Sequence, residues 1–293
     1  MDKQPQIIVI TGPTAAGKTA HGVFVAKTLG GEIVSADSMQ VYKHMNIGTA
    51  KPTEEEMQGV PHHMLDIVSP FEDYSVSRYV EDAALCIDDI VRRGKTPILV
   101  GGTGLYIDSL LSGRGFLARG DAALRSNLEK EYDDLGGEAL LGRLKEVDPE
   151  SAARLHANDK KRIIRAIEVY MATGKTISQH DMETKALPPR YDVKKYALTF
   201  SNRAELYERI DKRVDTMIEK GLPDEVQSLF DMGVTADCTS MQAIGYKEMT
   251  DVILGKCDIN SAIEKIKMES RRYAKRQLTW FRRDPEIEWL IND

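Results

Sequence analysis

Eight residues near the start of the chain, Gly12 to Thr19, have the types and spacing of a phosphate-binding loop. Their sequence, Gly-Pro-Thr-Ala-Ala-Gly-Lys-Thr, matches the pattern G-x-x-x-x-G-K-[ST]. In such a loop the glycines let backbone N–H groups converge on phosphate oxygens, and the following helix N-terminus adds partial positive charge. Lys18 supplies a full charge, and the hydroxyl of Thr19 can bind magnesium. The motif therefore predicts a site for a diphosphate or triphosphate group, whatever that group is attached to.

Asp37 ends the second apolar segment of the chain, Glu32-Ile33-Val34-Ser35-Ala36-Asp37. Open α/β sheets place their ligands at the carboxyl ends of the strands, so we expect Asp37 to face the phosphate pocket. A purely structural role is the alternative, because aspartate is a common turn residue.

The third apolar segment, 97–100, ends in Gly101-Gly102-Thr103. Proteins that process nucleoside triphosphates often carry an acidic residue there that helps to hold magnesium. Here the glycines permit close approach of the backbone, and Thr103 can donate to a phosphate oxygen without adding negative charge. A plain tight turn is the alternative. The missing acid raises the question of what the loop binds.

The elements that must position these residues alternate between strands and helices. We predict strands at 6–11, 31–35, 97–101 and 195–200, and helices from the phosphate loop to Leu29 and over 75–93, 203–220 and 261–283. The alternation is typical of strand-helix-strand units in a parallel sheet. The sequence therefore predicts an α/β fold, a parallel-sheet core like that of P-loop NTPases.

A segment without convincing strands interrupts this pattern between residues 117 and 190. Its charged, Leu- and Ala-rich stretches predict helices over 122–132, 137–147 and 159–172. We therefore expect a core built from residues 1–116 and 191–293, with helices at its C-terminal end, and a helical insertion at 117–190.

A basic helix is predicted near the end of the chain. Residues 264–283 hold eight Lys or Arg against two Glu, although the whole chain has a net charge of −6. At 100° per residue, a stripe free of acidic residues runs along one side, formed by Arg271, Arg272, Lys275, Arg276, Arg282 and Arg283. A solvated face is the alternative, but the one-sided charge favours contact with nucleic-acid phosphates.

Two further pairs of arginines have helical spacing. Arg162 and Arg165 are three residues apart, and Arg209 and Arg213 are four apart, so each pair shares a helix face. Solvated surface arginines are the alternative for any one of them.

Composition excludes several other classes of protein. Hydrophobic residues make up 42% and charged residues 29% of the 293 residues, as in ordinary globular proteins. There is no apolar run of membrane-spanning length and no signal-like segment, so we expect a cytoplasmic protein. Neither the three dispersed cysteines nor the adjacent His62 and His63 have the spacing of a zinc site.

Several motifs together resemble the tRNA dimethylallyltransferase family. They are Gly12–Thr19, Asp37-Ser38-Met39-Gln40-Val41-Tyr42, Ile47-Gly48-Thr49-Ala50-Lys51-Pro52, Pro61-His62-His63, Gly101-Gly102-Thr103-Gly104-Leu105-Tyr106, Asp159–Glu168, Gly245-Tyr246 and Lys275–Arg282. The resemblance implies transfer of a dimethylallyl group from dimethylallyl diphosphate to the exocyclic amine of the adenosine 3′-adjacent to the anticodon of tRNA. The loop would then hold the diphosphate of a prenyl donor, which requires no additional acid.

On this resemblance we assign roles to individual residues. Asp37 is the expected general base, assisted by Lys18 and Thr103, and Mg²⁺ is expected on Thr19. The diphosphate is expected to contact Gly12, Pro13, Thr14, Ala15, Ala16, Gly17, Lys18, Thr19, Arg209 and Arg213. The tRNA is expected to contact Asp37, Ser38, Met39, Gln40, Thr103, Arg125, Lys161, Arg162, Arg165, Gln242, Gly245, Tyr246, Lys247, Arg272, Lys275, Arg276 and Arg282. The protein is expected to act as a monomer, away from membranes.

Two positions depart from the commoner pattern of the family. Ala16 replaces a serine and His44 replaces a glycine, and neither change removes a proposed catalytic group.

Three other functions remain alternatives at this point. Prenylation of free AMP needs the same donor site without a basic helix, and a nucleotide kinase also combines a phosphate loop with a helical lid. A non-catalytic RNA-binding module would leave the loop and Asp37 without a role.

Overall fold

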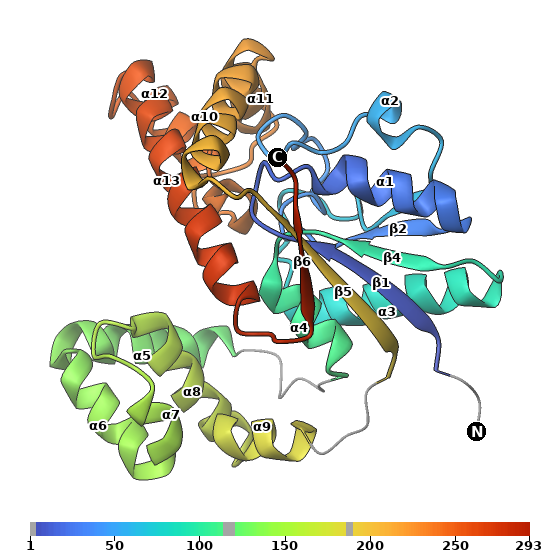
Figure 1. Cartoon of the computed structure of the whole chain (residues 1–293). Helices are drawn as coiled ribbons and strands as arrows, with labels where there is room; N and C mark the ends of the chain where they lie inside the picture. The colour runs from blue at the N-terminus through green and yellow to red at the C-terminus, as the bar shows by residue number, and fades with distance from the viewer. Residues whose placement is uncertain (1–3, 114–120, 186–189) are drawn as a thin grey trace. The chain divides into compact units, whose positions relative to one another are not determined.

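The structure, a computed structural model, describes residues 4–113, 121–185 and 190–293. The chain divides into two compact units (Figure 1), Met1–Leu111 together with Arg190–Asp293, and Ser112–Pro189. The second unit covers nearly all of the insertion predicted at 117–190. Residues 117–120 and 186–189 of that insertion lie outside the described residues.

A parallel sheet forms the centre of the first unit. Its described strands are β1 Gln6–Thr11, β2 Glu32–Ser35, β3 His62–His63, β4 Pro97–Val100, β5 Asp192–Thr199 and β6 Ile287–Ile291. Their order is β3-β2-β4-β1-β5-β6, so the strand that leads into the phosphate loop lies between β4 and β5. This confirms the predicted α/β fold, and the two strands that the sequence did not predict, β3 and β6, lie at the edges of the sheet.

Both faces of the sheet are buried, which explains why its central strands are almost continuously apolar. Successive side chains of a strand point to opposite faces. Ile7 and Val9 accordingly belong to one core cluster, and Ile8 and Ile10 belong to another. The first cluster includes residues of the helix over 76–92, and the second includes residues of the helix over 18–29.

Helices cover the sheet and form a group near its carboxyl edge (Figure 1). They are α1 Lys18–Leu29, α2 Glu54–Met57, α3 Val76–Arg92, α4 Gly104–Leu111, α10 Arg203–Glu219, α11 Leu222–Asp231, the 3-10 helix η1 Thr239–Gln242, α12 Tyr246–Ile253 and α13 Ile259–Phe281. The predicted limits of α1, α3, α10 and α13 are confirmed to within two residues. Gly30, with φ 62°, ends α1, and the side chain of Asp258 caps the N-terminus of α13.

The second unit is helical. It contains α5 Ala122–Leu135, α6 Gly137–Val147, α7 Pro149–Ala153, α8 Lys160–Thr173 and α9 Ile177–Lys185. It has a hydrophobic core of its own, to which Leu128, Leu144 and Ile163 belong. In neither unit do the described residues form a helix that combines the length and the hydropathy needed to cross a membrane.

Candidate active site

The phosphate loop joins β1 to α1 and has the backbone shape that its glycines permit. Gly12 has φ 131° and Gly17 has φ 86°, both of which disfavour residues with a side chain. A Cβ atom on Gly12 would also collide with the backbone oxygen of Leu198 in β5. These two glycines allow the loop to turn tightly at the carboxyl edge of the sheet.

Lys18 lies at the start of α1 and folds back over the loop. Its Nζ donates to the backbone oxygen of Pro13 at 2.7 Å. Burial, helped by the charge of Arg213 and opposed by that of Asp37, lowers the pKa of Lys18 to about 7. A cation that is poorly solvated in this way gains most from an anionic ligand.

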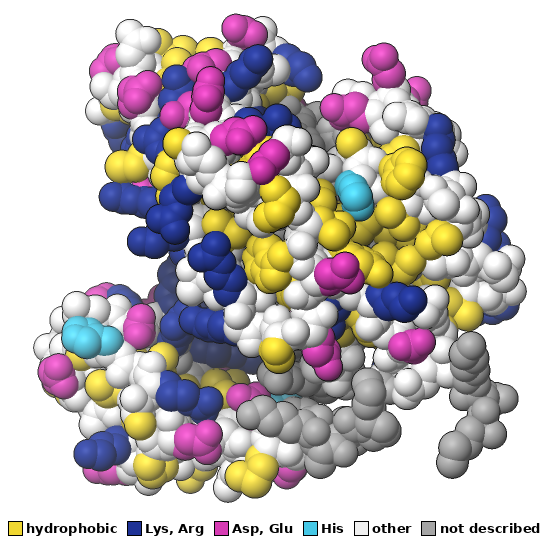
Figure 2. Space-filling model, in the orientation of Figure 1, with side chains coloured by type: hydrophobic (Ala, Val, Ile, Leu, Met, Phe, Trp, Pro, Cys, Tyr) yellow, Lys and Arg dark blue, Asp and Glu magenta, His cyan; other side chains and the backbone are white. Residues whose placement is uncertain are grey.

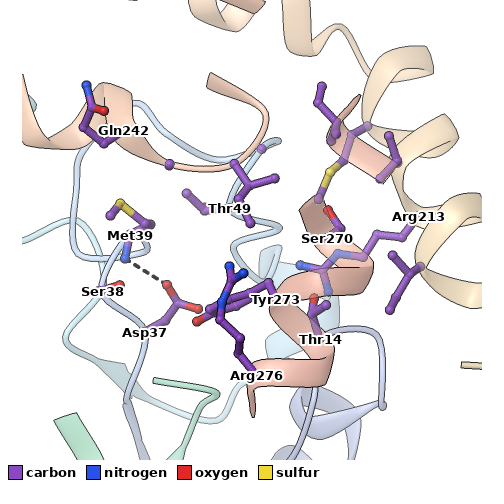
Figure 3. Close-up of a pocket in the computed structure, with 17 residues that line it drawn as sticks. Thr14, Asp37, Ser38, Met39, Thr49, Arg213, Gln242, Ser270, Tyr273 and Arg276 are labelled. Carbon is purple, nitrogen blue, oxygen red and sulfur yellow. Dashed lines mark hydrogen bonds between the residues drawn. The ribbon is translucent and has the colours of Figure 1, made fainter. Parts of the chain in front are cut away.

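Asp37 follows β2 and faces a cavity beside the loop. Its Oδ1 atom accepts from the backbone N–H of Met39 at 2.8 Å (Figure 3) and of Gln40 at 3.3 Å. These two bonds form a turn of the kind that aspartate favours. They do not involve Oδ2, so the structural role of Asp37 leaves a second carboxylate oxygen for chemistry.

Thr103 ties the loop after β4 to the loop after β2. Its N–H donates to the backbone oxygen of Ala36 at 3.1 Å, and its Oγ1 accepts from the N–H of Ser38 at 3.2 Å. A Cβ on Gly101 would collide with the same Ala36 oxygen, so a glycine is needed for this close approach.

Two cavities meet at Asp37. The loop pocket, of about 360 Å³, is lined by residues of the phosphate loop, including Lys18 and Thr19, and by Gly101 and Gly102. The helix pocket, of about 290 Å³, is lined by Ser38, Met39, Gln242 and residues of α10 and α13 (Figure 3). Thr14, Asp37, Arg213 and Tyr273 line both. An anion on the loop and a second molecule in the helix pocket could therefore react beside Asp37.

The two arginines predicted on α10 both lie near the loop. Arg209 donates from Nε to the backbone oxygen of Ala15 at 3.3 Å, and its guanidinium lies 5.1 Å from the centre of the Phe200 ring. Arg213 is half-buried; burial lowers its pKa and the Asp37 carboxylate opposes that shift. Both are placed so that they could contact a diphosphate.

Three residues that bear on the site were not predicted from the sequence. Gln277 is buried, and its Oε1 accepts from the N–H of Thr14 at 2.8 Å while its Nε2 donates to Gly102 O at 2.9 Å. Asn292 donates from Nδ2 to the backbone oxygen of Ala16 at 3.0 Å. Tyr273 borders both pockets. A polar amide on the apolar side of α13 was the available signal for Gln277, whereas no pattern in the sequence indicated Asn292.

The basic stripe of α13 is present, and Figure 2 shows Lys and Arg side chains gathered along this part of the first unit. Lys275, Arg276 and Arg282 are exposed, and the guanidinium of Arg276 lies 5.7 Å from the centre of the Tyr273 ring.

Two cations of the stripe are paired with acidic residues that lie outside it. Arg271 pairs with Asp211 of α10, and Arg272 pairs with Glu269 at 2.6 Å. The residue pattern of α13 alone could not reveal Asp211, because Asp211 lies on another helix. Glu269 lies on α13 itself, one turn before Arg272, and the long side chain of Arg272 reaches back to it.

Several residues predicted to contact tRNA make bonds within the protein. Gln40 donates from Nε2 to the backbone oxygens of Thr49 and Ala50, both at 3.2 Å, and Gln242 donates to Ala236 O at 2.8 Å. Gly245 donates its N–H to Glu248, and Lys247 is exposed.

Tyr246 requires a correction, because its side chain is fully buried and cannot contact an RNA in this structure. Its hydroxyl donates to Glu225, whose carboxylate also accepts from the N–H groups of Ile47 and Gly48. Tyr246 therefore supports the loop that borders the helix pocket, from within the core.

In the second unit, two of the predicted arginines flank a buried acid. Arg125 donates to both carboxylate oxygens of Glu168, at 3.1 Å and 3.3 Å, and Arg165 donates to Oε2 at 2.8 Å. Lys161 and Arg162 are exposed on α8. The exposed cations of this helix remain available to an anionic partner.

The described residues contain no group of three or more His, Cys, Asp or Glu that could hold a metal ion. His62 contacts Val60 O through Nδ1 at 2.8 Å, and His63 contacts Glu32 through Nε2 at 2.7 Å. Thr19, which lines the loop pocket, is the residue whose hydroxyl could bind an ion together with a diphosphate.

Comparison with known sequences identifies close relatives. The family described as IPP transferase matches residues 40–284, and the family described as isopentenyl transferase matches residues 5–70. The tRNA dimethylallyltransferase of Acetivibrio thermocellus is 48% identical over 98% of this chain and 92% of its own length. That of Caldanaerobacter subterraneus subsp. tengcongensis is 50% identical, again over 98% and 92%.

Solved structures agree with the sequence comparison. The tRNA isopentenylpyrophosphate transferase from Bacillus halodurans shares 45% identity and a TM-score of 0.72, over 99% of this chain and 90% of that chain. A eukaryotic dimethylallyltransferase, captured acting on tRNA, shares 31% identity and a TM-score of 0.84, over 98% of this chain and 74% of that chain.

Proposed function

The chain belongs to the tRNA dimethylallyltransferase family, and we propose that it transfers a dimethylallyl group from dimethylallyl diphosphate to the exocyclic amine of the adenosine 3′-adjacent to the anticodon of a tRNA. The observation that carries the proposal is the meeting of the two pockets at Asp37. One pocket has the groups that bind a diphosphate, and the other can receive a base beside the carboxylate.

The loop pocket would hold the donor. N–H groups of the phosphate loop and the ammonium of Lys18 suit the diphosphate, and Arg213 borders the same cavity. Arg209 is held beside the loop by its bond to Ala15. Diphosphate is the leaving group of the reaction, so cations fixed in advance favour its departure.

The residues present fit a magnesium ion. Mg²⁺ prefers oxygen ligands and usually keeps several waters while it binds substrate phosphates, so few protein ligands are needed. Thr19 would hold it together with oxygens of the diphosphate. Its contribution would be to neutralise negative charge that develops on the leaving diphosphate.

Asp37 would act on the acceptor. The amine lone pair forms a bond to C1 of the dimethylallyl group as the bond from C1 to the diphosphate oxygen breaks, and the electron pair of that bond leaves with the diphosphate. A proton of the amine passes to Asp37, whose Oδ2 is not used by the turn. The adenine must leave the stack of the anticodon loop to reach this position.

The exposed Lys275 and Arg276 of α13, and Arg282 directly after this helix, would bind phosphates of the tRNA near the helix pocket. Arg276 itself lines that pocket. Lys161 and Arg162 of the second unit would also bind the RNA. We expect the active form to be a monomer in the cytoplasm.

A single incubation tests the proposal. The purified protein is mixed with dimethylallyl diphosphate labelled in the prenyl group, unmodified tRNA, AMP and magnesium. We expect the label in tRNA, at the adenosine beside the anticodon, and little in AMP. Equal labelling of AMP would identify an adenylate prenyltransferase instead. A second incubation, with AMP and ATP labelled in its γ-phosphate, would identify a kinase by transfer of the labelled phosphate.

A further inference from the structure

Tyr273 lies at the junction of the two pockets. Among the described residues it lines both pockets, together with Thr14, Asp37 and Arg213. It is also the only Phe, Tyr or Trp among the described residues that line either pocket. A group that leaves a diphosphate in the loop pocket for an amine beside Asp37 must cross this junction.

The Tyr273 side chain is half-buried at the junction of the two pockets. Its hydroxyl lies within reach of hydrogen bonds with Thr103 and Gln277. Burial and the negative charge of Asp37 raise the pKa of Tyr273 to about 12, so the phenol stays neutral at physiological pH. Arg276 lies 5.7 Å from the ring centre but lines only the helix pocket. Tyr273 also lines the loop pocket, which Arg276 does not line.

The other junction groups are unsuited to a positive charge on carbon. Arg213 is itself a cation and favours the diphosphate, and the N–H of Thr14 is a donor already bonded to Gln277. The carboxylate of Asp37 is needed as the base. An aromatic face attracts a cation without reacting with it or accepting its proton.

We propose that the ring of Tyr273 contacts the dimethylallyl group in the transition state and stabilises the positive charge that develops on its allylic carbons. The charge appears because the bond from C1 to the diphosphate oxygen breaks ahead of full bond formation to the adenosine amine. The bond changes are those of the proposed reaction, on which this inference depends. Tyr273 adds no covalent step and is a catalytic residue through its contact with the reacting carbons.

The test changes the electrons of the ring while keeping its shape. The series consists of Tyr273→Phe and of Tyr273 replaced by phenylalanines that carry one, two or three fluorines on the ring. All of these side chains have nearly the same size. The single-turnover rate is measured with saturating donor and tRNA. We expect Tyr273→Phe to keep most of the rate, and the logarithm of the rate to fall with each fluorine, to a total loss of roughly two- to thirtyfold. Tyr273→Leu should lose at least as much.

A matched series at Tyr207 provides the control. This tyrosine is half-buried on α10 and is not among the described residues that line either pocket, so its fluorination should leave the rate unchanged. A second probe is a donor with one fluorine on a methyl of the allyl group, which should slow the wild-type protein because fluorine destabilises a neighbouring cation.

Each result bears on the proposal. A flat fluorine series at Tyr273, or a fluorinated donor that reacts at the normal rate, would overturn the role of the ring. A loss in Tyr273→Phe as large as that in Tyr273→Leu would assign the effect to the hydroxyl and so overturn it too. Absence of transfer by the wild-type protein would instead overturn the proposed function, which separates the two failures.

Discussion

Gln277 of α13 accepts a hydrogen bond of 2.8 Å from the backbone N–H of Thr14 in the phosphate loop, 263 residues earlier in the chain. The other end of the same amide donates to Gly102 O at 2.9 Å. One buried side chain therefore joins the loop proposed to bind the diphosphate, the loop after β4, and the helix proposed to bind tRNA. It also fixes which backbone N–H groups remain for the ligand, because that of Thr14 is already used.

Replacing Gln277 should weaken donor binding. Gln277→Ala leaves the Thr14 N–H and the Gly102 oxygen without their partner, at a cost of about 1–3 kcal/mol for each group that stays buried and unsatisfied. We expect the KM for dimethylallyl diphosphate to rise by about tenfold or more, with a smaller change in tRNA affinity. Steady-state kinetics with each substrate varied in turn would measure both.

Two controls accompany this variant. Gln227→Ala removes an exposed glutamine that bonds within its own helix, and it should have no effect on KM. Gly102→Ala alone should raise the KM for the donor, because a Cβ at this position would collide with Nε2 of Gln277. The same substitution should raise KM less in a protein that already carries Gln277→Ala. Additive effects of the two substitutions would contradict the proposed contact.

Binding of the donor should take up a proton above neutral pH. The pKa of Lys18 is lowered to about 7 in the empty site, so at pH 8 the amine is mostly neutral there. A bound diphosphate raises that pKa, so the ammonium must re-form on binding. Calorimetry with a non-transferable thio analogue of the donor, in two buffers of different ionisation enthalpy, should give an uptake of about one proton at pH 8.

Lys18→Met is the matched control for this linkage. The variant should bind more weakly and should lose the proton uptake that depends on Lys18. The affinity of the wild-type protein should be highest at or below pH 7 and should fall as the pH rises. The stability of the empty protein should change with pH in the opposite direction. Below about pH 7 the lowered pKa of Lys18 destabilises the folded state, because a proton must be held on a buried amine. This destabilisation decreases as the pH rises toward 10.5. Equal uptake by both proteins would exclude Lys18 as the titrating group.

The local pattern of the sequence predicted most of the first unit. The apolar segments before the phosphate loop, Asp37 and Gly101 form β1, β2 and β4. In the second unit, the helix predicted at 137–147 is observed over the same residues. Periodicity and capping signals carry this information because they depend on neighbours in the chain. The edge strand β6 was missed, because its alternating residues, Ile-Glu-Trp-Leu-Ile, follow shortly after a strong helical pattern.

Contacts between distant segments could not be predicted in this way. The sequence could not identify Thr14 and Gly102 as the partners of Gln277. The pairing of Arg271 with Asp211 joins two helices, and the hydroxyl of the buried Tyr246 donates to Glu225 of another helix. These relationships arise from how the elements pack together and leave no periodic signal.

The basic helix should dominate the salt dependence of tRNA binding. If Lys275 and Arg276 each neutralise one phosphate, their double change to Ala should flatten the slope of log K against log salt by about 1.4–1.8. Arg271→Ala is the control, because the partner of Arg271 is Asp211 and its loss should change the slope less. Filter binding at several salt concentrations measures each slope. An unchanged slope in the double variant would mean that this face of α13 is solvated in the complex.

Asp37→Asn tests the chemistry most directly, because the structure separates the two roles of the side chain. An amide oxygen can still accept from the N–H groups of Met39 and Gln40, so the turn should persist. The atom that replaces Oδ2 can no longer accept a proton from the amine. The single-turnover rate should therefore fall by about two to four orders of magnitude, as expected for loss of a positioned general base. Asp37 also raises the pKa of Lys18, so the donor must be saturating for the rate to report chemistry alone.

Asp37→Ala, which loses the turn as well, should be impaired at least as much, while both variants should bind tRNA nearly as tightly as the wild-type protein. If Asp37→Asn kept the wild-type rate and only Asp37→Ala lost it, the carboxylate would be a turn-forming group and the base would have to be sought elsewhere in the helix pocket.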